Sequence, residues 1–345
     1  MAKTILSDKI VLITGGTGSW GHELTLQLFE KYPDVAEIRI YSRGEHKQVQ
    51  MRREFKDNPR LRFIIGDVRD KSILTYAMSG VQVVFHLAAL KHVPICEDNP
   101  WEAVLTNIIG TQNVIEAAIN NDVQIVVDVS TDKAVEPFNV YGVTKACGEK
   151  LMINANAYYS KMKSSKTKFI CIRGGNVIGT QGSVIQLFKK QLIESNAITV
   201  TDSSMTRFLM NTSEAINLIF IAMEQPFGGE LFVMRMPGAT VSTIAKAMIE
   251  LFGNSKTTIE EIGLRPGEKQ HEVLISKNEA LFTRVYSDEY YLILPQLKNA
   301  ALLNKYASLK VFSGSDFSSA NTRMLTEKEL ESILKKERWL WTDKK

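Results

Sequence analysis

The sequence predicts an α/β fold, in which a doubly wound parallel sheet has helices on both faces and is followed by a smaller C-terminal lobe. Short β-branched apolar runs alternate with longer helical patterns through the first half of the chain. This alternation is typical of parallel strands that are joined by crossover helices. A glycine-rich turn follows the first apolar run, and after about residue 175 the elements become shorter and more mixed.

Each expected strand is a short apolar run of the kind that is buried on both faces of a parallel sheet. The expected strands are residues 10–14, 38–41, 62–65, 81–86, 123–129 and 169–172. The expected helices include residues 18–31, 101–121 and 140–161, and residues 326–341 form an amphipathic terminal helix. We therefore place the large domain at residues 1–175, and the lobe and tail mainly at residues 176–345, with some later segments returning to the large domain.

Composition excludes several classes of protein. The chain has 345 residues, with 44% apolar and 23% charged residues, as in ordinary globular proteins. A net charge of +4 gives no reason to expect a nucleic-acid partner. Cys96, Cys147 and Cys171 have no metal-like spacing and are typical of a reduced, intracellular protein. Because no apolar stretch is long enough for a membrane span, we expect a cytoplasmic protein with no membrane insertion and no bound metal.

The turn after the first strand, TGGTGSWG, has the glycine spacing of a dinucleotide-binding loop. Gly15, Gly18 and Gly21 would let backbone amides approach a pyrophosphate at a helix N-terminus. The loop follows an expected strand and precedes an expected helix, the context that distinguishes a Rossmann-type cofactor site from an ordinary turn. The expected cofactor contacts in this loop are Gly15, Thr17, Gly18, Ser19, Trp20 and Gly21.

The end of the second strand favours NADP over NAD. The stretch YSRGEHKQ places Arg43 and Lys47 where an acidic residue would otherwise bind the adenosine ribose. The alternative is that Arg43 is a solvated surface charge. Farther along, Asp67 and Val68 follow the third strand and are expected to bracket the adenine. Ser42, Ala88 and Ala89 complete the expected cofactor site.

The segment STDKAVEPFNVYGVTK concentrates reactive side chains. Tyr141 and Lys145 lie four residues apart, on one face of an expected helix. Asp132 and Lys133 precede them as a neighbouring acid and base. In isolation, a surface helix with a half-buried tyrosine and an ion-paired turn would account for both pairs. Behind a dinucleotide loop, a catalytic interpretation is favoured.

Taken in order, the motifs of this chain resemble the extended short-chain dehydrogenase/reductase superfamily. More narrowly, they are similar to the UDP-N-acetylglucosamine 4,6-dehydratases, especially the C5-inverting branch that begins pseudaminic acid synthesis. The motifs are TGGTGSWG, YSRGEHKQ, GDVRD, HLAALKHVP, TNIIGTQNV, STDKAVEPFNVYGVTK, GNVIGTQGSV, MTRFLM and LRPGEKQHEVLIS. The chain departs from that family at Trp20, Gly44 and Gly174, where Phe, Asp and Tyr are usual.

This resemblance implies a lyase with a tightly bound NADP that is recycled in each turnover. Tyr141 would take the proton of a sugar hydroxyl, Lys145 would lower the tyrosine pKa, and Thr131 would bond the same hydroxyl. Lys133 would be the base at carbon 5, and Asp132 the acid at the leaving 6-hydroxyl. Asp132 must then be protonated and Lys133 neutral, and burial is expected to shift both in that direction.

The same resemblance implies that the C-terminal lobe binds a nucleotide sugar. The expected substrate contacts are Lys91, His92, Asn176, Ser183, Val184, Arg207, Arg265 and Glu268. Arginines suit a diphosphate because they bind it through two nitrogens. Glu268 would orient Arg265 or bond the uridine ribose.

The leading hypothesis is NADP-dependent dehydration of UDP-N-acetylglucosamine to a UDP-4-keto-6-deoxy sugar, with inversion at carbon 5 to the L-arabino series. The alternatives are a C5-retaining dehydratase, a UDP-sugar 4-epimerase, which needs neither Asp132 nor Lys133, and a non-catalytic NADP-binding regulator. We also expect a homo-oligomer, a dimer or a hexamer, in which the helix from Trp101 pairs across a two-fold axis.

Overall fold

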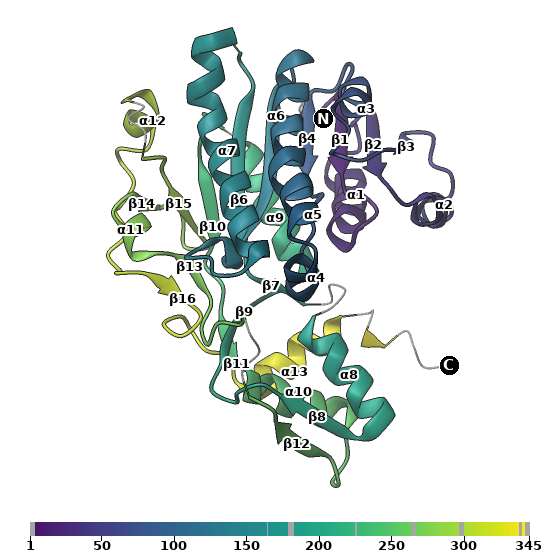
Figure 1. Cartoon of the computed structure of the whole chain (residues 1–345), viewed down its shortest axis with the longest axis vertical. Coiled ribbons are helices and arrows are strands. Elements are labelled where there is room, and N and C mark those ends of the chain that lie inside the picture. The colour runs from purple at the N-terminus through teal and green to yellow at the C-terminus, as the bar shows by residue number, and fades with distance from the viewer. Residues whose placement is uncertain are drawn as a thin grey trace.

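A nine-stranded sheet forms the centre of the protein (Figure 1). The computed structural model describes residues 4–163, 165–178, 183–224, 226–263, 267–296, 300–337 and 340–341. The strand order is β14-β15-β10-β6-β5-β4-β1-β2-β3, and neighbours are parallel from β3 to β10. The parallel strands are β1 Ile10–Thr14, β2 Glu37–Ser42, β3 Leu61–Ile65, β4 Val83–His86, β5 Ile125–Thr131, β6 Lys168–Gly174 and β10 Leu231–Met234. The antiparallel edge consists of β15 Tyr290–Ile293 and β14 Thr283–Val285.

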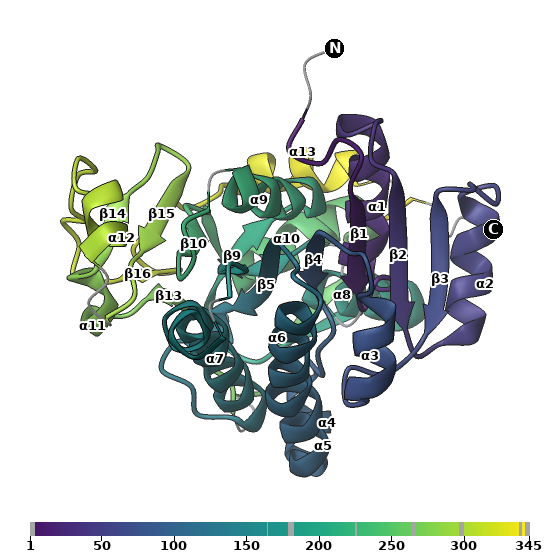
Figure 2. The same cartoon turned by 90° about the horizontal axis from the view of Figure 1, so that it is seen from above.

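Helices cover both faces of this sheet (Figure 2). One face carries α1 Ser19–Lys31 and α9 Thr212–Glu224, which pack against each other. The other carries α3 Lys71–Ala77, α6 Gly110–Asn120 and α7 Val140–Lys163. Shorter elements connect or flank them: α2 Glu45–Glu54, α4 Val93–Asp98, α5 Pro100–Val104, a π-helix at Leu105–Ile109 and a 3₁₀ turn at Asp132–Ala134. The predicted doubly wound α/β fold is confirmed.

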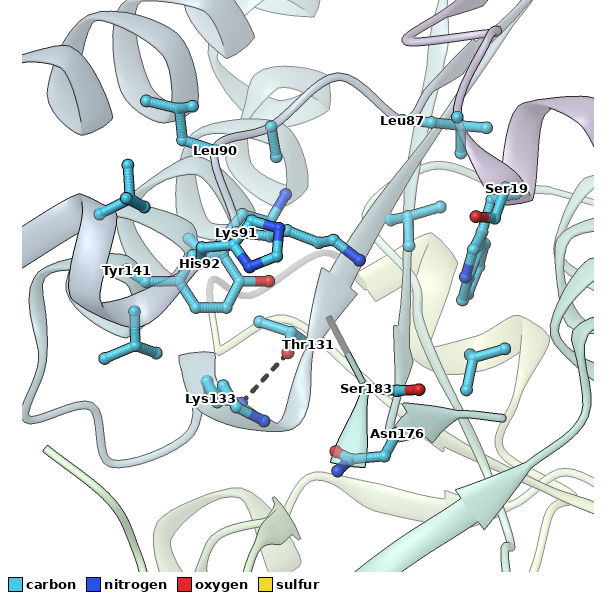
Figure 3. Close-up of a pocket in the computed structure, with 18 of the residues that line it drawn as sticks. Ser19, Leu87, Leu90, Lys91, His92, Thr131, Lys133, Tyr141, Asn176 and Ser183 are labelled. Carbon is cyan, nitrogen blue, oxygen red and sulfur yellow. Dashed lines mark hydrogen bonds between the residues drawn. The ribbon is translucent and has the colours of Figure 1, made fainter. Parts of the chain in front are cut away.

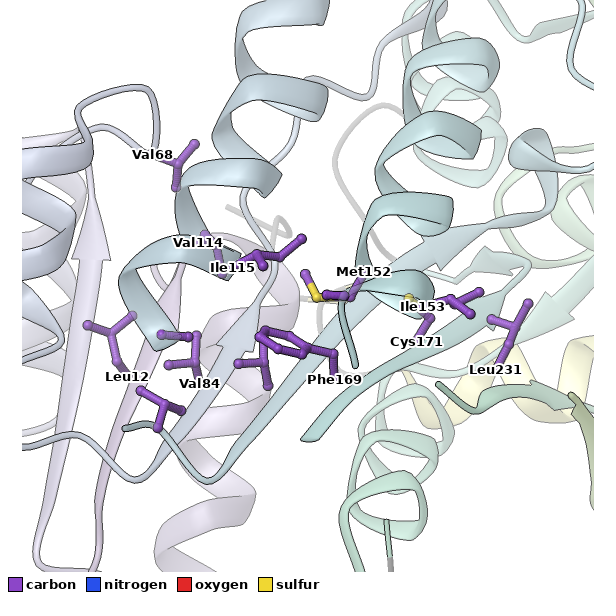
Figure 4. Close-up of a cluster of buried hydrophobic side chains, with 14 of the residues drawn as sticks. Leu12, Val68, Val84, Val114, Ile115, Met152, Ile153, Phe169, Cys171 and Leu231 are labelled. Atoms are coloured by element: carbon purple, nitrogen blue, oxygen red, sulfur yellow. The ribbon is translucent and has the colours of Figure 1, made fainter. Parts of the chain in front are cut away.

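Alternating side chains of each strand supply two separate cores. On β1, Leu12 packs on the side of α6 and α7, whereas Val11 and Ile13 pack on the side of α1 and α9. Successive residues of a strand point to opposite faces, so a continuous apolar run serves both cores. Phe169 of β6 lies at the centre of the first core with Met152 of α7 (Figure 4).

A smaller lobe lies beyond the carboxyl edge of the sheet and has a core of its own (Figure 1). Its elements are α8 Val184–Ser195, β8 Ala197–Val200, α10 Val241–Phe252, β12 Thr258–Glu261 and α13 Glu327–Lys336. A three-stranded sheet of β7 Asn176–Val177, β9 Thr206–Met210 and β11 Gly238–Thr240 leads into it. The remaining elements are β13 Val273–Ile275, α11 Lys277–Ala280, α12 Ala300–Lys305 and β16 Phe317–Ser318.

The predicted elements are present, with differences of detail, and the terminal helix predicted at residues 326–341 ends at Lys336. β4 and β5 each begin two residues later than predicted. The helix predicted at 101–121 is interrupted by the π-helix, and wide turns of this kind are frequent at functional sites. Within the described part of the chain, no helix has both the length and the apolar character that a membrane span requires.

Candidate active site

A pocket of about 1010 Å³ opens where the parallel strands end, between the sheet and the smaller lobe. Its wall includes residues that follow β1, β2, β3, β4, β5 and β6 in turn. Every predicted site residue that the structure describes lines this pocket, while Arg265 lies outside the described residues. In Figure 3, Tyr141 and Lys133 approach the pocket from one side, and Asn176 and Ser183 lie across from them. No group of His, Cys, Asp and Glu suited to a metal ion occurs among the residues described.

The glycine-rich loop forms a cradle at the N-terminus of α1. Gly15 has a φ of 66°, and a Cβ placed on it would lie 2.9 Å from the backbone of Ala88. A Cβ on Gly21 would lie 2.3 Å from the carbonyl oxygen of Gly16. Both positions therefore need glycine, and the loop presents backbone amides and a positive helix end to the pocket. These residues fit the pyrophosphate of a dinucleotide.

The outer end of this cradle is basic. Arg43 follows β2 and is 58% exposed, with its Nη1 3.8 Å from Oδ2 of Asp67. Lys47, in α2, also lines the pocket. Burial acts to raise the pKa of Asp67, but hydrogen bonds from Arg69 and the charges of Arg69 and Arg43 lower it below the ordinary value. Asp67 is therefore an anion paired with Arg69 and Arg43. Arg43, the residue directly after β2, is a cation.

Tyr141 and Lys145 lie on the first turns of α7 and are both buried. Burial acts to lower the pKa of Lys145, but Asp128, whose Oδ1 lies 3.6 Å from the Lys145 Nζ, raises it together with Tyr141. Burial raises the pKa of Tyr141, whereas Lys145, Lys133 and a hydrogen bond with Thr131 lower it in part. The protein groups alone therefore do not produce the predicted lowering of the Tyr141 pKa, because the effect of burial is larger than that of the Lys145 and Lys133 ammonium groups.

His86 lies beneath this pair at the end of β4. Its Nδ1 is 2.8 Å from the Thr14 hydroxyl, and its Nε2 is 3.2 Å from the Thr111 hydroxyl. Burial lowers the His86 pKa to about 4, and Asp128 opposes this shift only partly. His86 is therefore neutral near pH 7, and Lys145 is the cation that balances Asp128.

Asp132 and Lys133 lie in the turn directly after β5. The Thr131 hydroxyl donates to Oδ1 of Asp132 at 2.9 Å, and Nζ of Lys133 donates to the same oxygen at 3.1 Å. Burial acts to lower the pKa of Lys133, but Asp132, Glu272 and Tyr141 raise it above the ordinary value. Burial thus acts on the Lys133 pKa in the predicted direction, but the expected net shift toward a neutral lysine is wrong for the protein groups, because two carboxylates stabilise the ammonium.

Sequence reasoning missed two charged residues of this pocket, Lys269 and Glu272, which come just before β13. Oε1 of Glu272 lies 3.5 Å from Nζ of Lys133 and 3.9 Å from Nε of Arg207. Nζ of Lys269 donates to the carbonyl oxygen of Val135 at 2.5 Å. One sequence signal was present: GEKQHE places four ionisable residues directly before a short apolar strand.

Two asparagines connect the segments around the reactive residues. Asn107, in the π-helix, bonds both the backbone nitrogen and the backbone oxygen of Leu90 at 2.9 Å, and so fixes the start of the loop that carries Lys91. Asn139 accepts from the backbone nitrogen of Gly142 at 2.8 Å and donates to the carbonyl oxygen of Gly267 at 3.0 Å. The first turn of α7 is thereby tied to the segment that contains Lys269 and Glu272.

The predicted substrate contacts surround the far side of the pocket. Arg207, on β9, is buried and donates to the carbonyl oxygen of Thr206 at 2.8 Å and to Oε1 of Glu268 at 3.3 Å. Glu268 is thus the partner of Arg207. Ser183 occupies the N-cap position of α8 without a capping side-chain hydrogen bond, and its buried hydroxyl has no hydrogen-bond partner within the described part of the chain. Lys91 enters the pocket beside Tyr141 (Figure 3), and burial together with Lys133 lowers its pKa.

Gly174 leaves space beside the cofactor loop. A Cβ placed on it would lie 3.4 Å from Sδ of Met210 and 3.6 Å from the Trp20 ring, which are ordinary contact distances. A side chain could therefore begin at this position without clash. The glycine and the larger tryptophan share one wall of the pocket.

Comparison with known proteins places this chain in a family. Residues 11–294 match the family described as polysaccharide biosynthesis protein. The chain belongs to this family. It is 43% identical over 331 residues, 95% of each chain, to a protein of Rickettsia canadensis (strain McKiel) named UDP-glucose 4-epimerase. The protein of the same name from Rickettsia rickettsii (strain Sheila Smith) is 42% identical, also over 95% of each chain.

Solved structures agree with this membership. The X-ray structure of Pen from Bacillus thuringiensis has a TM-score of 0.87 and 40% identity, covering 96% of this chain and 99% of Pen. DesIV, a dTDP-glucose 4,6-dehydratase from Streptomyces venezuelae, has a TM-score of 0.69 at 20% identity, covering 96% of this chain and 99% of DesIV, which shows a shared fold. The protein is an enzyme of the nucleotide-sugar epimerase/dehydratase family.

Proposed function

We propose that this enzyme is a 4,6-dehydratase that acts on UDP-N-acetylglucosamine. The observation that carries the proposal is the acid–base pair Asp132 and Lys133, whose contact atoms are 3.1 Å apart in the same pocket as Tyr141 and Lys145. Oxidation of a sugar hydroxyl uses only the tyrosine and its lysine. Elimination of a second hydroxyl needs a further acid and a further base at the adjacent carbons.

In the first step, Tyr141 takes the proton of the 4-hydroxyl while Thr131 bonds the same oxygen. Lys145, held by Asp128, provides a fixed positive charge one helical turn away. A bound nicotinamide dinucleotide would accept hydride from carbon 4 and return it to carbon 6, and its positive ring would add to the charge that favours the Tyr141 phenolate. Because the cofactor is restored in each turnover, it is expected to stay tightly bound.

In the second step, the ion pair of the free enzyme supplies both reactive groups. Transfer of one proton from Nζ of Lys133 to Oδ1 of Asp132 produces a neutral amine and a carboxylic acid, with no exchange with solvent. The amine then removes the proton of carbon 5, which the 4-ketone has made acidic, and Asp132 protonates the leaving 6-oxygen as water. We further propose inversion at carbon 5, because the Asp132–Lys133 sequence with Tyr141 resembles the inverting branch.

Two parts of the pocket suit the ligands of this reaction. Arg43 and Lys47 support NADP, since cations at this point match a 2′-phosphate. The N-terminus of α8, where the Ser183 hydroxyl has no partner among the residues that the structure describes, suits a diphosphate anion, and Arg207 adds a buried positive charge. The contribution proposed for Arg265 rests on sequence resemblance alone.

A UDP-sugar 4-epimerase is the second candidate. The relatives from Rickettsia carry that name at 41–43% identity over nearly the whole chain. An epimerase would use Tyr141, Lys145 and the cofactor in the same way but would retain the 6-hydroxyl. The two activities therefore differ in the mass of the product.

Incubation with UDP-N-acetylglucosamine and, separately, with UDP-glucose tests these candidates by mass spectrometry. Loss of one water from the first sugar supports the dehydratase, whereas a product of unchanged mass with altered ring-proton couplings supports the epimerase. Proton NMR in deuterated water then reports the configuration at carbon 5, and a D-xylo first product would contradict inversion. Lys133→Met is the matched variant, since it is expected to stop water loss while the 4-hydroxyl is still oxidised.

Self-association also remains a proposal. Trp101, on α5, is 65% exposed, and Ile95 of α4 is 51% exposed on the neighbouring turn. Exposed aromatic and branched side chains of this size commonly mark contacts between subunits. Sedimentation that shows only monomer at micromolar concentration would contradict the expected dimer or hexamer.

A further inference from the structure

Glu272 is a buried carboxylate at the junction of the two lobes. It is 3% exposed and precedes β13, far in the sequence from the turn that holds Asp132 and Lys133. Its Oε1 is 3.5 Å from Nζ of Lys133, and its Oε2 has no hydrogen-bond partner among the described residues. A buried, poorly hydrogen-bonded carboxylate is costly, so its placement beside the elimination pair requires an explanation.

Asp132 and Glu272 approach Lys133 in different ways. Asp132 receives hydrogen bonds from both the Thr131 hydroxyl and the Lys133 ammonium, at 2.9 and 3.1 Å. Glu272 faces Nζ at the longer distance of 3.5 Å, too long for efficient proton transfer but short enough for a strong charge interaction away from bulk water. Asp132 is thus the group that exchanges a proton with Lys133, and Glu272 is a fixed negative charge.

The groups that face Glu272 are mostly cationic. They are Lys133, Arg207 on β9, Lys269 on its own segment, and one acid, Asp132. Burial raises the pKa of Glu272 above its ordinary value, and the three cations oppose that shift only in part. The proton that Asp132 takes up comes from Lys133, so the negative charge of Asp132 and the positive charge of Lys133 disappear together. Arg207 and Lys269 then remain as the two cations that act on Glu272. These surroundings favour the ionised form of Glu272 during the elimination.

We propose that Glu272 is a positioning residue that keeps Lys133 basic during removal of the carbon-5 proton. This inference rests on the proposed dehydration. After the proton has moved to Asp132, that side chain no longer stabilises an ammonium, and Glu272 is the carboxylate that remains beside Nζ. As the C5–H bond breaks, Nζ gains the proton and the electron pair forms the C5=C6 double bond. The C6–O bond breaks with this, and Asp132 gives its proton to the departing 6-hydroxyl, which leaves as water. The negative charge of Glu272 stabilises the positive charge that develops on Lys133.

Glu272→Gln tests this proposal because it removes the charge and keeps the shape. Dehydration is expected to slow by roughly tenfold to a hundredfold, the scale for loss of one charged partner. Oxidation at carbon 4 is expected to keep its rate, and the isotope effect of deuterium at carbon 5 is expected to increase. Glu261→Gln, on the exposed strand β12, is the matched control. An unchanged carbon-5 isotope effect in Glu272→Gln would overturn the proposal, since a merely structural role would slow both steps alike.

A second measurement does not depend on turnover. Lysines of the whole protein are methylated with ¹³C-formaldehyde and titrated by NMR, and Lys133→Arg assigns the Lys133 signal. We expect Glu272→Gln to lower the pKa of Lys133 and Glu272→Asp, with its shorter side chain, to lower it less. Equal Lys133 pKa values in the wild type and both variants would refute the coupling. Absence of water loss in the wild type would instead refute the proposed dehydration, and the titration would still decide the coupling.

Discussion

The two reactive halves of the pocket are built in contrasting ways. The half that contains Tyr141 and Lys145 is assembled from β4, β5 and α7 of the large domain, and its lysine is balanced by one buried carboxylate, Asp128. The half that contains Lys133 has two carboxylates around one lysine, and Glu272 comes from the segment before β13. The first half comes from the sheet and one helix of the large domain, whereas the second half also needs Glu272 from a segment that is distant in the sequence.

This difference suggests a division of labour. A tyrosine and lysine fixed by the sheet suit a step that many related enzymes share, transfer of hydrogen at a hydroxyl. A lysine held between carboxylates suits an acid–base step that is added to it. The predictions below test whether the two halves act separately.

The largest expected effect comes from Tyr141→Phe, which removes the group that takes the 4-hydroxyl proton. We expect turnover to fall by about 100- to 10,000-fold, the range for one acid–base group. Release of cofactor on denaturation of the purified protein should be unchanged, because the glycine loop is intact. Turnover close to that of the wild type would show that the two halves do not divide the reaction in this way.

His86 links the first half to folding stability. Folding lowers its pKa from 6.5 to about 4, so the unfolded chain binds the proton more readily. The contribution of neutral His86 to the free energy of unfolding is therefore fully present above pH 6.5. It is lost as the pH falls toward 4, and the loss is about 3 kcal/mol. Urea unfolding of the wild type and His86→Asn over this pH range is expected to show a smaller loss in the variant. If the unfolding free energies of the wild type and His86→Asn fell equally with pH, groups other than His86 would cause the loss of stability in acid.

Gly142 is a point of contact between the halves, because a Cβ on it would lie 2.3 Å from the carbonyl oxygen of Lys133. Gly142→Ala is expected to cost about 1–3 kcal/mol of unfolding free energy through overpacking. It should also slow both oxidation and elimination, in contrast to Glu272→Gln. Gly44→Ala, where the added Cβ would meet only Lys47 side-chain atoms near 4 Å, is the matched control. If Gly142→Ala lost elimination but kept oxidation, the added methyl group would have displaced the Lys133 turn without moving Tyr141 and Lys145 on α7.

Arg43→Ala is expected to have the smallest effect. The side chain is 58% exposed, so solvent screens its charge, and we expect NADP affinity to weaken about tenfold with little change for NAD. Fluorescence titration with both cofactors, after the bound cofactor has been removed, measures the ratio. Equal losses for NADP and NAD would mean that Arg43 contacts a part common to both cofactors.

Local patterns in the sequence were sufficient for much of the fold and for one half of the site. The six expected strands, the glycine cradle at Gly15 and the Tyr141–Lys145 pair depend on periodicity, turn chemistry or a spacing of four within one helix. Each of these is decided by residues close together in the chain. The return of β10, β14 and β15 to the large sheet was only a general expectation, since strand pairing across long separations leaves no local signal.

Only the tertiary structure decided the charge state of the second half. Asp132 and Lys133 are neighbours in sequence, and burial alone predicted a neutral lysine. Glu272 reaches the same lysine across a gap of more than a hundred residues. Asp132, with the larger contribution, and Glu272 together reverse the direction of the Lys133 pKa shift. Coulomb energy depends on distance in space and on the exclusion of water, and neither quantity can be read from the order of residues along the chain.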